Sequence, residues 1–268
     1  MATRGYREKY GEWALVTGAS AGIGLEFART LARDEKMSIV LTARREDRLR
    51  KLAEEFKRDY GVESRVIAAD LADPAGAGKL ADAVADIPIS MLVNNAGFGY
   101  AGRFDKLETG RLAAMVIVNC LAPVVLTSRI LPAMVKRKRG AVIIVGSVAG
   151  RQPLPLHCVY AATKAFDLLF GEGLWAELRG TGVDAIVLEP GATKTEFPSV
   201  AGEIVGPNHG EPPENVVRAT FDALGRQPSV VSGWGNYLLA NATRLVPHSV
   251  AARIARRVVE ANTPPELR

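Results

Sequence analysis

The stretch Thr17-Gly18-Ala19-Ser20-Ala21-Gly22-Ile23-Gly24 directly follows a short apolar run, residues 13–17, and opens a segment with helical spacing. Gly18 can make the tight turn, Gly22 lets the backbone approach a pyrophosphate closely, and Gly24 permits close helix–strand contact. The helix N-terminus then offers free N–H groups to an anion. A glycine triplet alone is weak evidence, because such turns also occur for structural reasons. A strand before it and a helix after it, within about 30 residues, make it a predicted dinucleotide-binding loop.

The same alternation of short apolar runs and helical patterns continues to about Pro190. The runs that we expect to form strands are 13–17, 38–43, 65–69, 90–94, 141–147 and 183–189. The segments with helical spacing are 23–34, 45–59, 74–85, 106–138 and 158–180. With a further short strand near 228–231, this pattern predicts an α/β fold. It is a Rossmann-type, doubly wound parallel sheet of about seven strands with helices on both faces. Pro123 is expected to kink or divide the long fourth helix.

The length of 268 residues, with 48% hydrophobic and 24% charged residues, is ordinary for a globular protein and excludes disorder as the main state. We expect one domain over 1–268. Its dinucleotide-binding and catalytic core covers 12–191, and a substrate loop covers 192–213. Within that loop, 196–213 is rich in Gly and Pro and is predicted to be mobile. Residues 214–268 are expected to form helices that cover the substrate, the first over about 214–224.

The formal net charge of +5 leaves nucleic acid, a membrane surface and an anionic ligand open as partners. The basic cluster 136–139 ends a predicted helix without interleaved aromatic residues, so no nucleic-acid partner is expected. Residues 249–260 place three apolar side chains on one stripe and arginines opposite. Packing on the protein itself or on a partner subunit is favoured there over peripheral membrane contact.

Targeting and metal signals are weak. The N-terminus is polar, and the apolar runs 113–126 and 140–150 are too short or too interrupted to be predicted as membrane spans. Two cysteines and three histidines predict no metal site. The expected location is cytoplasmic.

The end of the second predicted strand indicates which nicotinamide cofactor binds. An NAD site favours Asp or Glu about 20 residues beyond the glycines. This region instead reads Thr42-Ala43-Arg44-Arg45, and two guanidinium groups can pair with a 2′-phosphate. The alternative is that the arginines are an ordinary solvated helix start. The missing carboxylate at Ala43 favours NADP(H).

A candidate catalytic set lies between residues 119 and 164. Tyr160 and Lys164 are four residues apart on a predicted helix, so they share a face, and the ammonium is expected to lower the pKa of the phenol. Tyr160 is therefore a candidate general acid–base group. Ser147 is expected to close the fifth strand at the edge where ligands bind, and Asn119 stands in an apolar helix where burial is costly unless the amide is satisfied. Each residue alone has an ordinary structural explanation. The combination of all four is much harder to explain by structural reasons alone.

The sequence resembles the short-chain dehydrogenase/reductase family in its short single-domain form, from about residue 12 to 195. The motifs that carry the resemblance occur in family order: Thr17 to Gly24, Asp70-Leu71, Asn94-Asn95-Ala96-Gly97, Asn119, Ser147, Tyr160 with Lys164, and Pro190-Gly191 followed by Thr195. The arginines after the second strand resemble those of the NADP-using subgroup. Another NADP subgroup has a basic residue directly before the second glycine, where this chain has Ala21. The 2′-phosphate contact is thus expected to rest mainly on Arg44, with Ser20 or Arg45 as helpers.

The resemblance implies roles for these residues. Ser147 would orient the substrate oxygen, Tyr160 would pass the proton, Lys164 would lower the pKa of Tyr160 and bind the nicotinamide ribose, and Asn119 would hold a water in a proton relay. The expected cofactor-binding set is Gly18, Ser20, Ala21, Gly22, Ile23, Gly24, Arg44, Arg45, Asp70, Leu71, Asn94, Ala96, Gly97, Tyr160, Lys164, Pro190, Gly191, Thr193 and Thr195.

These observations predict an NADP(H)-dependent oxidoreductase that transfers hydride between nicotinamide and a small-molecule carbonyl or secondary alcohol. Apolar residues near the expected pocket (Phe98, Leu154, Leu156 and Phe197) weakly indicate an apolar ketone or aldehyde. The alternatives are a non-catalytic NADPH-binding sensor or scaffold and a cofactor-retaining epimerase or dehydratase. The family also implies a homodimer or homotetramer formed through the helices at 106–138 and 158–180.

Overall fold

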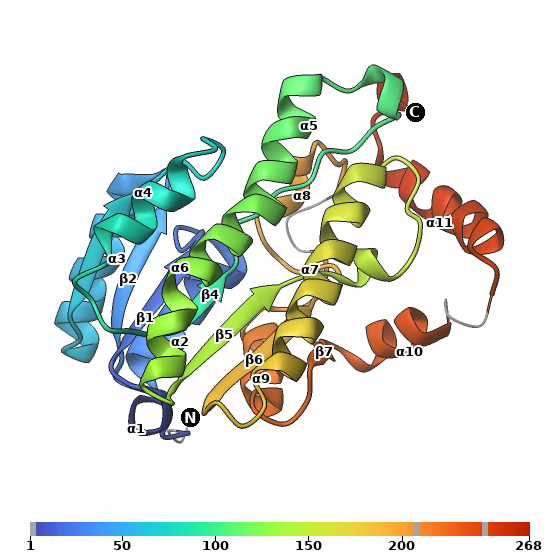
Figure 1. The fold of residues 1–268 in the computed structure, drawn as a ribbon. Coiled ribbons are helices and arrows are strands. Elements are labelled where there is room, and N and C mark those ends of the chain that lie inside the picture. The colour runs from blue at the N-terminus through green and yellow to red at the C-terminus, as the bar shows by residue number, and fades with distance from the viewer. Residues whose placement is uncertain (1–3, 206–208, 243–245) are drawn as a thin grey trace.

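Seven parallel strands form one sheet in the order β3-β2-β1-β4-β5-β6-β7 (Figure 1). The computed structural model describes residues 4–205, 209–242 and 246–268. The strands are β1 (Trp13–Thr17), β2 (Ser38–Ala43), β3 (Ser64–Ala68), β4 (Ile89–Asn94), β5 (Gly140–Val145), β6 (Val183–Glu189) and β7 (Ser229–Val231). The chain runs outward from β1 to β3 and then returns to start the other half at β4. Ligands of such sheets bind beside this switch point, at the carboxyl ends of the strands. The predicted fold is confirmed.

Helices cover both faces of the sheet, because every central strand is apolar on both sides (Figure 1). One core lies between the sheet and α2 (Gly22–Arg33), α3 (Glu46–Glu55) and α9 (Pro213–Ala223). The other lies under α4 (Gly76–Ala83), α6 (Ala122–Lys136) and α7 (Cys158–Glu177). The remaining α-helices are α1 (Tyr6–Tyr10), α5 (Thr109–Val116), α8 (Phe197–Ala201), α10 (Trp234–Ala242) and α11 (His248–Asn262). Short turns of other helix types are η1 (Phe56–Tyr60), η2 (Phe104–Lys106), η3 (Ile117–Leu121), η4 (Val148–Arg151) and η6 (Pro265–Leu267).

The long fourth helix is divided, as Pro123 predicted. A π-helical turn, η3, separates α5 from α6, and Pro123 occupies the first turn of α6. The whole stretch Thr109–Lys136 is long and apolar enough to cross a membrane by length and composition alone, with a mean hydropathy of 1.9. It is longer than the apolar run 113–126. Part of it packs against β4, β5 and α4, and this core packing accounts for much of its apolar character.

Two local expectations were wrong. β5 ends at Val145, so Ser147 lies two residues beyond the strand, where it caps η4 by accepting a hydrogen bond from the Ala149 amide. Residues 197–201, expected to be loop, form the short helix α8, which Pro198 can begin because its missing N–H falls in the first turn. Residues 206–208 of that loop lie outside the described residues.

Two of the three apolar side chains on the α11 stripe are largely exposed, and the third, Val250, is half-buried. Ile254 and Val258 are 57% and 65% exposed, and the helix instead buries Ala251 and Ala255. The small side chains of Ala251 and Ala255 let α11 pack closely on the rest of the protein. The buried face of the helix is therefore not the one that carries Ile254 and Val258. The exposed part of the stripe is thus open to a partner subunit, which is one of the expected alternatives.

Candidate active site

The glycine loop follows β1 and opens α2, and its backbone is held by two side chains. Gly18 and Gly22 have φ of 68° and 59°, a region that side chains disfavour. The Thr17 hydroxyl accepts hydrogen bonds from the backbone N–H groups of Asn95 and Ala96, both at 2.9 Å. The Asn95 amide in turn donates to the Thr17 carbonyl at 2.8 Å. A Cβ at Gly24 would collide with that Asn95 amide. These hydrogen bonds fix the backbone of the glycine loop, so the loop needs no ligand to take this conformation.

Arginines gather beside this loop at the start of α3. Arg45 donates from Nε and Nη2 to the Ser20 hydroxyl, at 3.3 and 3.1 Å. Its Nη1 and the Nη1 of Arg48 both pair with the carboxylate of Glu196, at 2.7 and 2.8 Å. Arg44 is exposed and makes no hydrogen bond or ion pair with the described residues. The sequence prediction did not include Arg48 or Glu196; the latter comes from a loop 151 residues away.

A cavity of about 590 Å³ opens at this point. Ser20, Gly22, Arg48, Lys194 and Glu196 are among its lining residues. Because it combines the N-terminus of α2 with basic side chains, it suits an anionic ligand.

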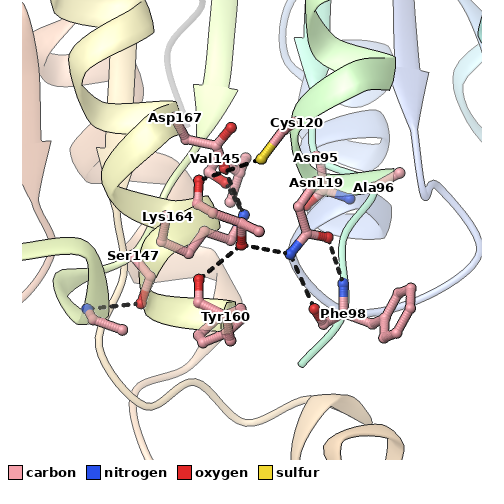
Figure 2. A network of polar contacts seen from close by, with 12 residues as sticks. Asn95, Ala96, Phe98, Asn119, Cys120, Val145, Ser147, Tyr160, Lys164 and Asp167 are labelled. Carbon is pink, nitrogen blue, oxygen red and sulfur yellow. Dashed lines mark hydrogen bonds and ion pairs between the residues drawn. The ribbon is translucent and has the colours of Figure 1, made fainter. Parts of the chain in front are cut away.

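The candidate catalytic side chains meet at the carboxyl ends of β4 and β5, against the N-terminal half of α7 (Figure 2). Tyr160 and Lys164 lie on one face of that helix, with the ammonium 6.0 Å from the centre of the phenol ring. The Phe197 ring packs against Tyr160 with ring centres 5.4 Å apart. Ser147 lies beside them at the end of the β5 loop. The structure thus brings Ser147, Tyr160 and Lys164 together as the sequence predicted.

Asn119 is 1% exposed and fully engaged within the protein. Its Oδ1 accepts from the Phe98 amide and its Nδ2 donates to the Phe98 carbonyl, both at 3.1 Å. The second Nδ2 proton reaches the Thr163 hydroxyl at 3.0 Å, and that hydroxyl donates to the Tyr160 carbonyl at 2.7 Å (Figure 2). The π-helical turn places Asn119 where it can tie the β4 loop to α7. Such turns often occur at functional sites.

Lys164 is held by a partner that the sequence analysis missed. Its Nζ donates to the Val145 carbonyl at 2.8 Å and pairs with Asp167 Oδ2 at 2.9 Å (Figure 2). Burial lowers the pKa of Lys164, but the Asp167 carboxylate and Tyr160 raise it, and the net direction is upward. Asp167 is 1% exposed, and its other oxygen has no hydrogen-bond partner among the described residues. Lys164 is thus fixed as an ammonium.

The pKa of Tyr160 departs from the expectation. Burial raises it, while the Lys164 ammonium and the Ser147 hydroxyl lower it; Asp167 and Glu203 raise it further. The net direction is upward, because burial destabilises the phenolate more than the neighbouring ammonium stabilises it. The sequence spacing revealed the ammonium but not the burial or the second carboxylate.

The other predicted residues lie in three different settings. Asn94 and Leu71 are buried, and the Asn94 amide donates to Thr127 at 3.1 Å, which is a contact within the core. Asp70 is exposed and caps its own turn through the Ala72 amide. Residues 190–195 follow β6, where the Pro190 carbonyl accepts from Val148 N–H at 3.1 Å and Thr195 accepts from the Phe197 amide at 3.1 Å. Thr195 also packs against Gly22, so this segment lies over the glycine loop.

Comparison with known proteins identifies the family. The short chain dehydrogenase family model matches residues 12–203. The chain is 34% identical over 237 residues to a 7beta-hydroxysteroid dehydrogenase of Collinsella aerofaciens, covering 86% of this chain and 89% of that protein. It is also 34% identical over 222 residues to the very-long-chain 3-oxoacyl-CoA reductase of Homo sapiens, covering 81% and 70%.

This chain is a short-chain dehydrogenase.

Solved structures agree with that assignment. One that describes 7beta-hydroxysteroid dehydrogenase stereoselectivity superposes on this dehydrogenase with a TM-score of 0.87 at 30% identity, covering 94% of this chain and 99% of that one. A short-chain dehydrogenase from Sphingobium yanoikuyae in complex with NADPH gives a TM-score of 0.77 at 29% identity, covering 87% and 93%.

The site of this dehydrogenase fits a nicotinamide dinucleotide. Gly18 and Gly22 adopt conformations that leave backbone amides free at the helix start, and Arg45 with Ser20 offers donors at the far end. At the other end, a Cβ at Gly97 would lie 3.2 Å from Asn119 Oδ1 and 3.5 Å from Lys164 Nζ, so Gly97 leaves room beside the catalytic groups that a side chain would crowd. Among the described residues no cluster of His, Cys, Asp or Glu could hold a metal ion.

Proposed function

We propose that this dehydrogenase uses NADPH to reduce a bulky apolar ketone, steroid-like in size, at the site formed by Ser147, Tyr160 and Lys164. The protein is an NADP(H)-dependent oxidoreductase acting on CH–OH and C=O groups. The observation that carries the substrate proposal is the Phe197 ring, which packs 5.4 Å from Tyr160 and gives the proton-transfer group an apolar neighbour. The name of the Collinsella relative agrees with a steroid.

The mechanism follows from the positions of the side chains. The bound nicotinamide supplies or accepts the hydride. Ser147 has a hydroxyl free to turn between the Pro190 carbonyl, 3.4 Å away, and a substrate oxygen, and so can orient that oxygen. Tyr160 donates the proton to the forming alkoxide. Lys164 stabilises the phenolate that results, because it is held as an ammonium by Asp167 and Val145. Asn119 keeps the β4 loop and α7 in register through Phe98 and Thr163.

A substrate panel tests the proposal. We expect NADPH consumption with 7-oxosteroids, weaker consumption with 3-oxoacyl-CoA compounds, and little with small aldehydes. NADH should support the same reactions at a much lower kcat/KM. A preference for acyl-CoA would overturn the steroid assignment, and equal use of NADH would overturn the cofactor assignment. No net NADPH consumption with any carbonyl, despite binding, would instead support a sensor.

Asp167 gives the reaction a pH dependence that mutation should change. Burial is the main reason that the pKa of Tyr160 is raised, and the Asp167 carboxylate raises it further, so the phenolate needed for alcohol oxidation forms at higher pH. Asp167→Asn removes that charge and keeps a hydrogen-bonding side chain beside Lys164. The expected result is a shift of the oxidation profile to lower pH, with carbonyl reduction also declining at lower pH than in the wild type.

The measurement is kcat/KM against pH in both directions. Glu172→Gln is the matched control, because Glu172 lies on the same helix but bonds Ser229. The titratable groups that face Tyr160 and Asp167 are Lys164, Glu203, Cys120 and His157. Burial raises the pKa of the Cys120 thiol to about 11 and lowers that of His157 to about 4, so both stay neutral near pH 7. An unshifted profile in a folded Asp167→Asn variant would remove Asp167 from the mechanism.

Assembly and location belong to the same proposal. The short-chain dehydrogenases generally form oligomers, and we infer a homodimer or homotetramer that uses α5, α6 and α7. Exposed apolar side chains support it: on α7, Leu169 is 71% and Phe166 39% exposed, and on η3, between α5 and α6, Leu121 is 39% exposed. The exposed stripe of α11 fits a partner subunit in the same assembly. A cytoplasmic location agrees with the proposed use of NADPH.

A further inference from the structure

The carboxylate of Glu196 occupies the arginine pair beside the glycine loop. Glu196 stands at the N-cap of α8, immediately after Thr195, and so belongs to the segment that lies over Gly22. One of its oxygens meets Arg45 at 2.7 Å and the other meets Arg48 at 2.8 Å. Two guanidiniums on two carboxylate oxygens form a bridge between the start of α3 and the substrate loop.

The same donors are the ones that a phosphate would use. Arg45 donates from Nε and Nη2 to the Ser20 hydroxyl, and its remaining nitrogen, Nη1, pairs with Glu196. A phosphate monoester and a carboxylate are recognised by guanidinium in the same forked manner. Hydrogen bonds from both arginines lower the pKa of Glu196, so the carboxylate is ionised at neutral pH and is an anion like the phosphate.

We propose that Glu196 is an internal competitor of the cofactor 2′-phosphate, and that it sets the affinity of this dehydrogenase for NADPH. This inference rests on the proposed binding of the 2′-phosphate by the arginines after β2. When the phosphate takes the donors of Arg45 and Arg48, Glu196 is released and α8 loses its tie to α3. Phe197, the first residue of α8, packs on Tyr160. A phosphate bound at the arginines therefore also affects the position of Phe197 beside the catalytic group.

The strength of this competition is modest. The three side chains are 41%, 44% and 47% exposed, so each ion pair is screened by water and salt. Removing the carboxylate charge should therefore tighten NADPH binding by about three- to tenfold, as expected for two exposed pairs of this kind. NADH, which brings no phosphate to the arginines, should gain less than about twofold by the same reasoning.

The test compares Glu196→Gln with Glu214→Gln. Glu214 lines the same cavity, so its substitution removes an equal charge without touching the bridge. Dissociation constants for NADPH and NADH are measured by cofactor fluorescence at low and high salt. The expected result is tighter NADPH binding in Glu196→Gln alone, with the gain shrinking at high salt.

Each outcome bears on one claim. Unchanged or weaker NADPH binding in Glu196→Gln, in a protein whose wild type prefers NADPH, overturns the competitor role. Equal tightening by Glu214→Gln also overturns it, because the effect would then be a general one of charge. A wild type that binds NADH as tightly as NADPH contradicts the cofactor proposal itself, and that result is visible before any variant is made.

Discussion

Replacing Tyr160 by Phe should reduce carbonyl reduction by about 10²- to 10⁴-fold, the usual contribution of a positioned general acid. The substitution removes the phenolic oxygen and leaves the ring against Phe197. Lys164 keeps its bonds to Val145 and Asp167, since neither involves the Tyr160 hydroxyl. NADPH binding should therefore stay within about twofold of the wild type, because no charged contact is lost.

The measurement pairs steady-state turnover with NADPH titration in the same preparation. Tyr60→Phe serves as the control, because Tyr60 lies in η1 beside Phe56, away from the catalytic groups. Retained turnover in Tyr160→Phe would exclude Tyr160 as the proton donor. A parallel loss of NADPH binding would show that the residue acts on the cofactor rather than on the proton.

The fold and the centre of the site follow from short-range patterns. The glycine loop can be read from the sequence because strand, turn and helix are adjacent in the chain, and φ of 68° at Gly18 is what such a turn requires. Tyr160 and Lys164 are four residues apart, so helical periodicity alone places them on one face. Ser147 follows β5 at the carboxyl edge of the sheet, whereas Asn119 is placed beside the site by the π-helical turn η3.

What the sequence did not predict depends on burial and on remote contacts. Glu196 reaches Arg45 across 151 positions, and no periodicity relates them. Asp167 is three residues from Lys164, so the sequence indicates that the two are close. An exposed pair at that spacing would have little effect on Lys164. Asp167 is 1% exposed, and this burial, which the sequence does not show, strengthens the ion pair. Burial of Tyr160 itself reverses the expected direction of its pKa shift, and the Asp167 carboxylate adds to that effect. Asn95 belongs to a motif that the sequence analysis recognised, but its hydrogen bond to the distant Thr17 can be seen only in the structure.

Removing the arginines after β2 should cost this dehydrogenase its cofactor preference. In the double variant Arg44→Ala/Arg45→Ala, the affinity for NADPH should fall by about 100-fold, as expected when two charged hydrogen bonds to one phosphate are lost. NADH affinity should change little, because its adenosine ribose carries no phosphate. Titration of both cofactors against wild type and variant gives the ratio directly.

The single variants then decide which arginine matters more. The sequence favours Arg44 as the main contact, whereas the structure shows Arg45 already directed over Ser20 and Arg44 exposed without a partner among the described residues. If Arg45 is the main contact, Arg45→Ala should account for most of the loss, and it should also release Glu196 from one of its two pairs. Arg50→Ala is the matched control, since Arg50 lies on the same helix and pairs with Glu46. An NADPH preference that survives the double variant would place the 2′-phosphate in the neighbouring cavity, whose basic lining side chains are Arg29, Arg48 and Lys194.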